Sequence, residues 1–150
     1  MFYTCTSPKC RRAAQVIQAN LKPIGIDLEV KTFPVGVVFD RVGKRGEPYD
    51  AAIVGWTADY PDPADVLNLL HGPSIGPKDN NSPWSNLNWS YFDHPSYNRR
   101  LDAAARLSGR QRYSAYAALD ADLARNAAPF AALFNPSEVD FFSARMGCQV

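Results

Sequence analysis

The first third of the chain carries a helical spacing of apolar residues. Between residues 11 and 24, apolar side chains recur every three or four positions, which is typical of an amphipathic helix. Ser7 and Pro8 suit the N-cap and the first helical position, while Pro23 and Gly25 end the pattern. The apolar face of this predicted helix consists of Ala14, Ile17, Leu21 and Ile24.

Shorter apolar runs predict strands on either side of such helices. Apolar and polar residues alternate strictly over residues 26–33, which predicts a half-buried strand. The runs Phe2–Thr4 and Ala51–Val54 predict two more strands, and residues 35–42 predict a second short helix. This order of strand, helix, strand, helix and strand is typical of a parallel sheet with crossover helices. The second helix is expected to direct inward Val38, Phe39 and Val42.

The second half of the chain predicts a long loop followed by helices. Residues 72–96 are rich in Gly, Pro, Asn and Ser, and loops of this length are uncommon unless they are functional. Helices are expected at residues 97–107 and 110–127, with strands at 130–134 and 139–142. The later helix is expected to bury a stripe of Tyr113, Tyr116, Leu119 and Leu123.

The segment Gly55–Asp65 joins a predicted strand to a predicted helix and contains two aromatic residues and three carboxylates. In open α/β sheets, ligands bind just outside the carboxyl ends of the strands, so this segment is a candidate site. Asp62 suits an N-cap before Pro63, and Asp65 could complete a capping box. The capping of this helix does not account for Asp59, which could itself cap a turn or could bind a ligand.

The same segment resembles a known signature. Residues 56–63 read Trp-x-Ala-Asp-Tyr-x-Asp-Pro, which resembles the family 5 extracellular solute-binding proteins, the receptors of bacterial ABC importers for oligopeptides, dipeptides and nickel. Two further segments are similar to the family. They are the Ile-Gly-Ile at residues 24–26 and the run Asn-Trp-Ser-Tyr-Phe at residues 88–92, with a proline at position 95.

The resemblance implies a fold and a setting. It implies that residues 1–150 form a single α/β lobe of the type II periplasmic-binding-protein fold, with a mixed, mostly parallel sheet flanked by helices. The lobe would be an excised or fragmentary second lobe, and a missing tail would hold the partner of Cys148. Implied partners are a missing N-terminal lobe and an ABC permease. The implied location is periplasmic or extracellular. A missing N-terminal segment could carry a lipid anchor. One lobe would supply only half of the ligand-binding cleft, so these residues alone are expected to bind solute weakly.

The resemblance also implies a ligand site. In peptide-binding relatives, the Asp of this motif holds the α-ammonium group of the peptide, which assigns that role to Asp59, with Trp56 and Tyr60 as aromatic contacts. Asn88 and Tyr91 are further candidate ligand contacts. Dipeptide-type members place an arginine near the end of the first strand, where this chain has Thr4 or Cys5. Longer peptides, other solutes and nickel chelates therefore stay open.

The composition and charge of the chain limit the classes of partner that it is expected to bind. The net charge of +1 gives no broad attraction to nucleic acid or anionic lipid. No apolar run approaches the roughly 18 residues of a membrane span. Cys5 and Cys10 are close enough for a disulfide but could equally be free thiols. His71 and His94 do not stand at metal-ligand spacing from a cysteine pair, and no cofactor-binding motif is present.

Three other functions compete with a receptor. Asp59 and Asp62 could form the carboxylate pair of a glycosidase. The same two residues with Asp65 could bind Ca²⁺, although their spacing is not that of an EF-hand. Finally, the aromatic loop over residues 84–92 could be the surface of a stand-alone interaction module without a role in transport.

Overall fold

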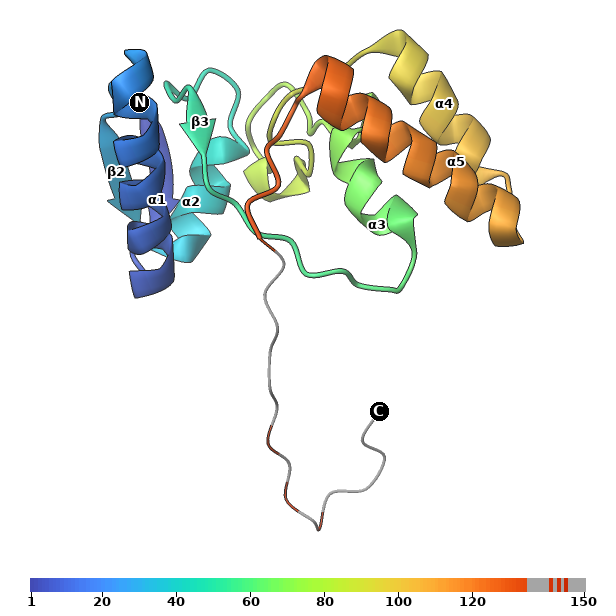
Figure 1. The fold of residues 1–150 in the computed structure, drawn as a ribbon, viewed down its shortest axis with the longest axis horizontal. Coiled ribbons are helices and arrows are strands. Elements are labelled where there is room, and N and C mark those ends of the chain that lie inside the picture. Colours follow the sequence, from blue (N-terminus) through green and yellow to red (C-terminus); the bar gives the residue numbers. More distant parts are fainter. Residues whose placement is uncertain (135–140, 142, 144, 146–150) are drawn as a thin grey trace.

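The computed structural model describes residues 1–134, 141, 143 and 145, and places a small parallel sheet beside a group of helices (Figure 1). Strands β1 (Phe2–Cys5), β2 (Val30–Phe33) and β3 (Ala51–Ala52) form a parallel sheet in the order β2-β1-β3. The predicted α/β class with a parallel sheet flanked by helices is therefore confirmed.

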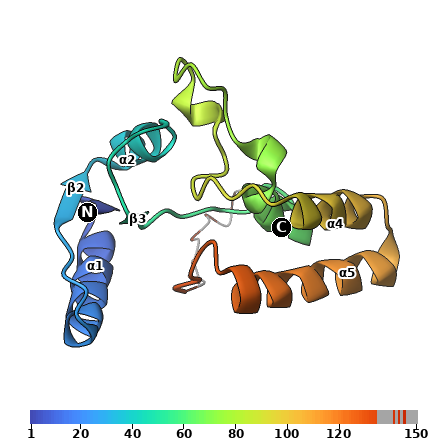
Figure 2. The ribbon, with the colours of Figure 1, turned by 90° about the horizontal axis from the view of Figure 1, so that it is seen from above.

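Two helices cover opposite faces of this sheet (Figure 2). Helix α1 (Pro8–Leu21) begins at the predicted cap, where Ser7 Oγ accepts a hydrogen bond from the Cys10 N–H. A 3₁₀ turn over Lys22–Ile24 follows α1 and ends at Gly25, whose φ of 83° lies in the left-handed region. Helix α2 (Val35–Val42) buries Val38 and Val42, as predicted.

The strand predicted over residues 26–33 is too long. The Ile26 N–H donates to the carbonyl of Leu21 as part of the helix ending, so it does not join a strand ladder. Ile24 and Ile26 are exposed as a result, and β2 begins only at Val30. The third strand is also shorter than predicted, since β3 stops at Ala52.

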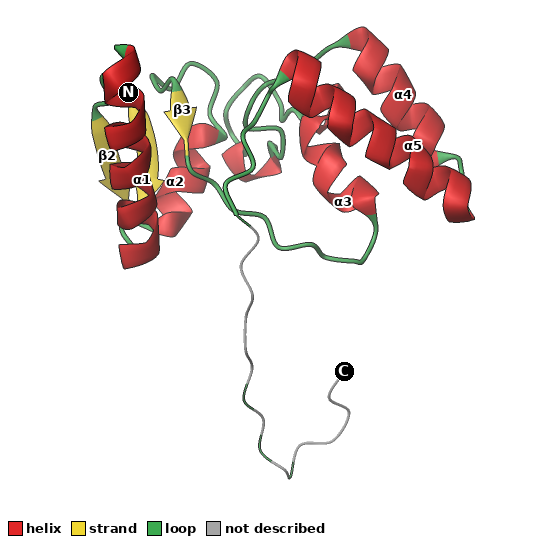
Figure 3. Cartoon of the chain, in the orientation of Figure 1, coloured by secondary structure: helices red, strands yellow, loops and turns green. Residues whose placement is uncertain are grey.

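The second half of the described chain is helical (Figure 3). Helix α3 (Pro63–Leu67) continues into a 3₁₀ turn at Asn68–Leu70, and α4 (Pro95–Ala105) packs beside α5 (Gly109–Asp122). A π-helical turn extends α5 over Leu123–Ala127. Further 3₁₀ turns lie in the long loop at Gly72–Ser74 and Pro83–Ser85. No helix in the described part combines the length and apolar character needed to cross a membrane.

The described residues form two separate hydrophobic clusters. The sheet cluster contains Tyr3, Cys5, Val38 and Val42 between the sheet and its helices. The helical cluster lies among α3, α4 and α5 and contains Leu67, Leu70, Tyr97, Leu101, Ala104, Tyr116, Leu119 and Leu123. The predicted stripe on α5 is therefore confirmed except at Tyr113, which is 55% exposed.

The predicted strand at residues 130–134 is wrong. Within the described ranges these residues pair with no strand, and Phe130, Leu133 and Phe134 are exposed. An apolar sequence forms a strand only where a neighbouring strand completes its backbone hydrogen bonds, and β1 is the only described partner of β3. The strand predicted at 139–142 falls largely outside the described residues, as does Cys148.

Candidate functional site

The centre of the site is the connection between β3 and α3, which contains Trp56 and Asp59. One carboxylate oxygen of Asp65, Oδ2, accepts a hydrogen bond from Trp56 Nε1 at 2.6 Å and another from the Asp59 N–H at 3.3 Å. Asp65 is only 6% exposed. The capping box predicted for Asp65 is therefore wrong, because its carboxylate organises the preceding loop instead.

Asp62 is the N-cap of α3, as predicted. Its Oδ1 accepts from the Ala64 N–H at 2.8 Å, and its two carboxylate oxygens also accept from Arg112 on α5. These hydrogen bonds, first those from Arg112, hold the pKa of the Asp62 carboxyl below its ordinary value. Asp62 is thus committed to the fold, which removes it from both the glycosidase pair and the Ca²⁺ site.

The carboxylate of Asp59 has no such partner. Asp59 is exposed, and its side chain makes no hydrogen bond or ion pair with any residue that the structure describes. Its backbone N–H is held by Asp65. The loop therefore fixes the main chain at Asp59 and leaves the carboxylate available to a ligand.

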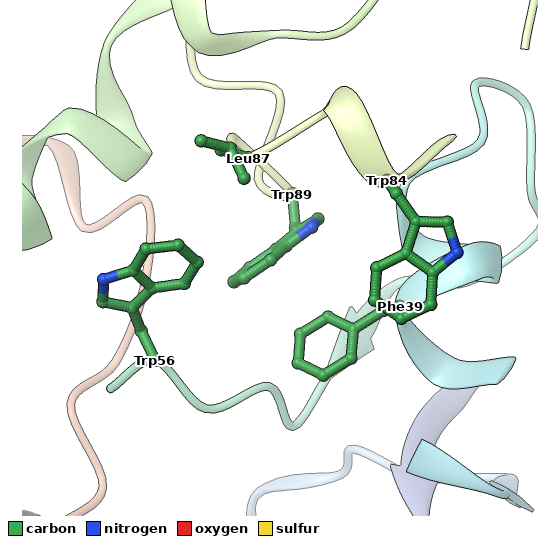
Figure 4. A pocket seen from close by; sticks show the side chains of 5 residues that line it. All are labelled: Phe39, Trp56, Trp84, Leu87 and Trp89. Carbon is green, nitrogen blue, oxygen red and sulfur yellow. The ribbon is translucent and has the colours of Figure 1, made fainter. Parts of the chain in front are cut away.

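An aromatic pocket of about 130 Å³ lies beside this connection (Figure 4). Trp89 stands between Trp56 and Phe39, with ring centroids 6.1 Å and 5.2 Å away. Phe39 in turn contacts Trp84 at 5.6 Å. We call this hollow the aromatic pocket; it is lined by Phe39, Trp56, Trp84, Leu87 and Trp89.

The end of α2 holds the loop that carries the pocket tryptophans. The Gly43 carbonyl accepts from Asn86 Nδ2 at 3.2 Å and from the Tyr91 hydroxyl at 2.9 Å. A Cβ on Gly43 would lie only 2.1 Å from the carbonyl oxygen of Pro83, so only glycine permits this approach. The backbone at Pro83, just before Trp84, therefore packs directly against the end of α2.

Asn88 and Tyr91 belong to this support. Asn88 is fully buried; its Nδ2 donates to the carbonyls of His71 and Phe92, and its Oδ1 accepts from the Phe92 N–H. Tyr91 has a φ of 53°, uncommon for a bulky residue, and its hydroxyl bonds Gly43. Both side chains are engaged within the protein and position the loop, and their contact with a ligand stays a prediction.

Tyr60 lies away from the aromatic pocket. It is 50% exposed and lines a second, more polar hollow of about 260 Å³ with Arg112, Tyr116 and the pair of His71 and Asp102. His71 Nε2 and Asp102 Oδ1 are 3.2 Å apart, but Nε2 makes no hydrogen bond with the described residues. Trp56 and Tyr60, both predicted as aromatic contacts of a ligand, therefore line different hollows.

At the end of β1, Cys5 and Cys10 are joined in a disulfide, which resolves the alternative of free thiols. Their Cα atoms are 5.4 Å apart. The bond closes the turn that leads into α1, where Ser7 is the N-cap. In the described part of the chain, no group of three or more His, Cys, Asp or Glu side chains could hold a metal ion.

Comparison with known proteins identifies the fold and its relatives. Residues 1–78 match the sequence model described as "Bacterial extracellular solute-binding proteins, family 5 Middle". The chain belongs to this family. The family consists of binding proteins and not enzymes, so the glycosidase alternative is not supported.

Curated relatives are peptide-binding proteins of Pseudomonas aeruginosa. "Di/tripeptide-binding protein 3" of strain UCBPP-PA14 and "Dipeptide-binding protein" of strain PAO1 are each 30% identical over 108 residues, which is 72% of this chain. The chain spans only 18% of the length of either relative.

Solved structures of periplasmic binding proteins share this fold. A periplasmic binding protein, DppA, from Helicobacter pylori in complex with the peptide STSA gives a TM-score of 0.63 at 26% identity, over 81% of this chain and 22% of that one. HbpA2 from Haemophilus parasuis gives a TM-score of 0.65 at 23% identity, over 85% of this chain and 25% of that one.

Two features of the site could not be predicted from the sequence. Trp84 and Trp89 were visible only as loop aromatics, and no spacing shows that they meet Trp56 and Phe39. Arg112 lies in the polar first turn of α5, 50 residues after the carboxylate that it binds. The one sequence feature that pointed to these tryptophans was the high density of aromatic residues in the loop over residues 84–92.

Proposed function

We propose that this chain is the ligand-binding part of a receptor that delivers peptides to an ABC importer. Asp59 binds the α-ammonium group of the peptide, and Trp56 packs against the adjoining part of the ligand. The observation that carries the proposal is the Asp59 carboxylate, unpaired among the described residues on a main chain fixed by Asp65. A carboxylate and an ammonium group form a charge-assisted hydrogen bond, the strong kind.

The names of the relatives support a peptide as the solute. The matched Pseudomonas proteins are named for dipeptides and tripeptides, and the Helicobacter structure holds a four-residue peptide. The arginine of dipeptide-type relatives is absent from the end of β1, where the disulfide of Cys5 stands. We therefore propose that the length of the peptide is not fixed by a carboxylate clamp at that strand.

The proposal extends to the whole receptor. The chain spans 18% of its curated relatives, so we place a second lobe, which would close over Asp59, in the remainder of a longer protein. Closure between two lobes buries a ligand by a hinge motion. The receptor would work in the periplasm or outside the cell, and it would pass its peptide to the permease of the importer.

The test is calorimetric titration of the full-length gene product with trialanine and with N-acetyl-trialanine. If Asp59 binds the ammonium group, acetylation and Asp59→Asn should each weaken binding about tenfold or more. Acetylation should cause little further loss in the Asp59→Asn variant. Asp27→Asn, an exposed carboxylate between α1 and β2, is the matched control and should bind like the parent. Equal affinity of the parent and Asp59→Asn for trialanine would overturn the assignment.

A further inference from the structure

The aromatic pocket has the size and lining of a receptor for one apolar group. Its volume of about 130 Å³, in a hollow that is partly open to solvent, suits a single side chain and not a whole peptide. All five lining residues are apolar or aromatic, and none carries a formal charge. A charged group entering it would lose hydration without gaining a counter-charge from the lining.

The polar atom of Trp56 is already used. Its indole N–H donates to Asp65, so the ring presents carbon atoms to the pocket and its orientation is fixed. Trp84, on the opposite side of Trp89, remains 59% exposed even though it contacts Phe39. The pocket therefore has a fixed inner wall and an outer wall that still has apolar surface to bury.

Asp65 links this pocket to Asp59. The same oxygen, Oδ2, accepts from the Trp56 indole and from the Asp59 N–H, so the wall of the pocket and the main chain that carries the Asp59 carboxylate are held at one point. A ligand with an ammonium group and an apolar side chain could bind at both places, provided that its backbone spans them. Because the Trp56 ring and the Asp59 main chain are organised before a ligand binds, less order has to be created on binding.

We propose that the aromatic pocket is a specificity site that selects peptides carrying one large apolar side chain, such as that of Phe or Leu, and disfavours a charged one. This proposal rests on the proposed function, since it assumes that peptides bind at Asp59. The side chain is enclosed by Trp56, Trp89 and Phe39, and Trp84 closes over it from the solvent side. Burial of such a group should tighten binding about 10- to 100-fold over alanine.

The experiment compares tripeptides by calorimetry with the full-length gene product. Alanine tripeptides receive a single Phe at each of the three positions in turn, and a matched series receives Lys. One Phe position should give about 10- to 100-fold tighter binding than trialanine, and Lys at that position should give no gain. Equal affinity for the Phe, Ala and Lys peptides at every position would overturn the proposal.

Two variants locate the selectivity. Trp84→Ala removes the exposed wall, and Leu87→Phe fills the pocket, so both should reduce the ratio of Phe to Ala affinity at the selected position. Tyr113→Ala removes an exposed aromatic residue on α5 and should keep that ratio. An unchanged ratio in both pocket variants would place the preference elsewhere and overturn the assignment. Failure of the proposed function is distinct, because trialanine would then bind equally to the parent and Asp59→Asn.

Discussion

Arg112 holds Asp62 with two hydrogen bonds, one from Nε and one from Nη2, both at 2.8 Å. The same guanidinium donates through Nη1 to the carbonyls of Ala104 and Ala105 at the end of α4. One side chain on α5 therefore joins the start of α3 to the end of α4. This contact fixes the direction in which the chain leaves the Asp59 loop.

Replacing Asp62 with asparagine should give a difference in stability that depends on pH. Asparagine caps a helix about as well as aspartate, so mainly the ion pair is lost. Because the folded-state pKa of Asp62 is lowered, the pair stabilises fully above the unfolded value of about 4 and is lost as pH falls through the folded value. Melting temperatures of the parent and Asp62→Asn should differ at about pH 7 and converge in acid. A gap of constant size down to about pH 2 would contradict this prediction.

The hydrogen bond from Trp56 to Asp65 should be worth more than an ordinary surface contact. Trp56→Phe keeps an aromatic ring but removes the donor to a buried carboxylate, so the free energy of unfolding should fall by about 1.5–3 kcal/mol. Trp84→Phe is the control, since its indole N–H makes no hydrogen bond with the described residues. Chemical denaturation measures both variants, and equal losses would show that the bond to Asp65 adds nothing.

Gly43→Ala should push the aromatic loop away from α2. The new methyl group would lie 2.1 Å from the Pro83 carbonyl oxygen, so either α2 or the turn before Trp84 must move. Strain of this kind costs about 1–3 kcal/mol of stability, and the tryptophan fluorescence should change because Trp84 is displaced from Phe39. Gly55→Ala is the control, because its Cβ would meet no atom within 4 Å. Identical spectra and denaturation midpoints for Gly43→Ala and the parent would refute the steric argument.

The disulfide between Cys5 and Cys10 should stabilise the protein modestly. It closes a short loop, for which chain entropy predicts about 2 kcal/mol. The double variant Cys5→Ser with Cys10→Ser should lose this amount in denaturant unfolding. Adding reductant should lower the stability of the parent but leave that of the double variant unchanged. A parent protein that is insensitive to reductant under conditions that break the bond would disprove the contribution.

Local signals predicted the parts of the fold that depend on local chemistry. Ser7 and Asp62 cap the helices that they were expected to cap, since an N-cap depends only on the next two or three residues. The failures involve long-range partners. Asp65 had the spacing of a capping box, but burial beside Trp56 gave its carboxylate another donor. Residues 130–134 had the composition of a strand without a paired neighbour in the described chain.

The candidate site shows the same division. The motif predicts Trp56 and Asp59 as ligand contacts because both lie in one short segment after a strand, and this stays a prediction. The aromatic pocket requires Phe39 from α2 and Trp89 from the long loop, and nothing in their spacing shows that they meet. Asn88 and Tyr91 were predicted as ligand contacts, and nothing in the sequence indicated the hydrogen bonds by which they hold the loop.

The sheet cluster and the helical cluster share no buried residue, and asparagine side chains such as Asn86 and Asn88 help to fasten the loop between them. Each cluster is therefore expected to open as its own cooperative unit, with its own rate of amide hydrogen exchange. Bonds through carboxamides are directional, whereas apolar packing tolerates sliding. The protein thus has two hydrophobic clusters connected by a loop that polar hydrogen bonds hold in place. The aromatic pocket lies at this connection.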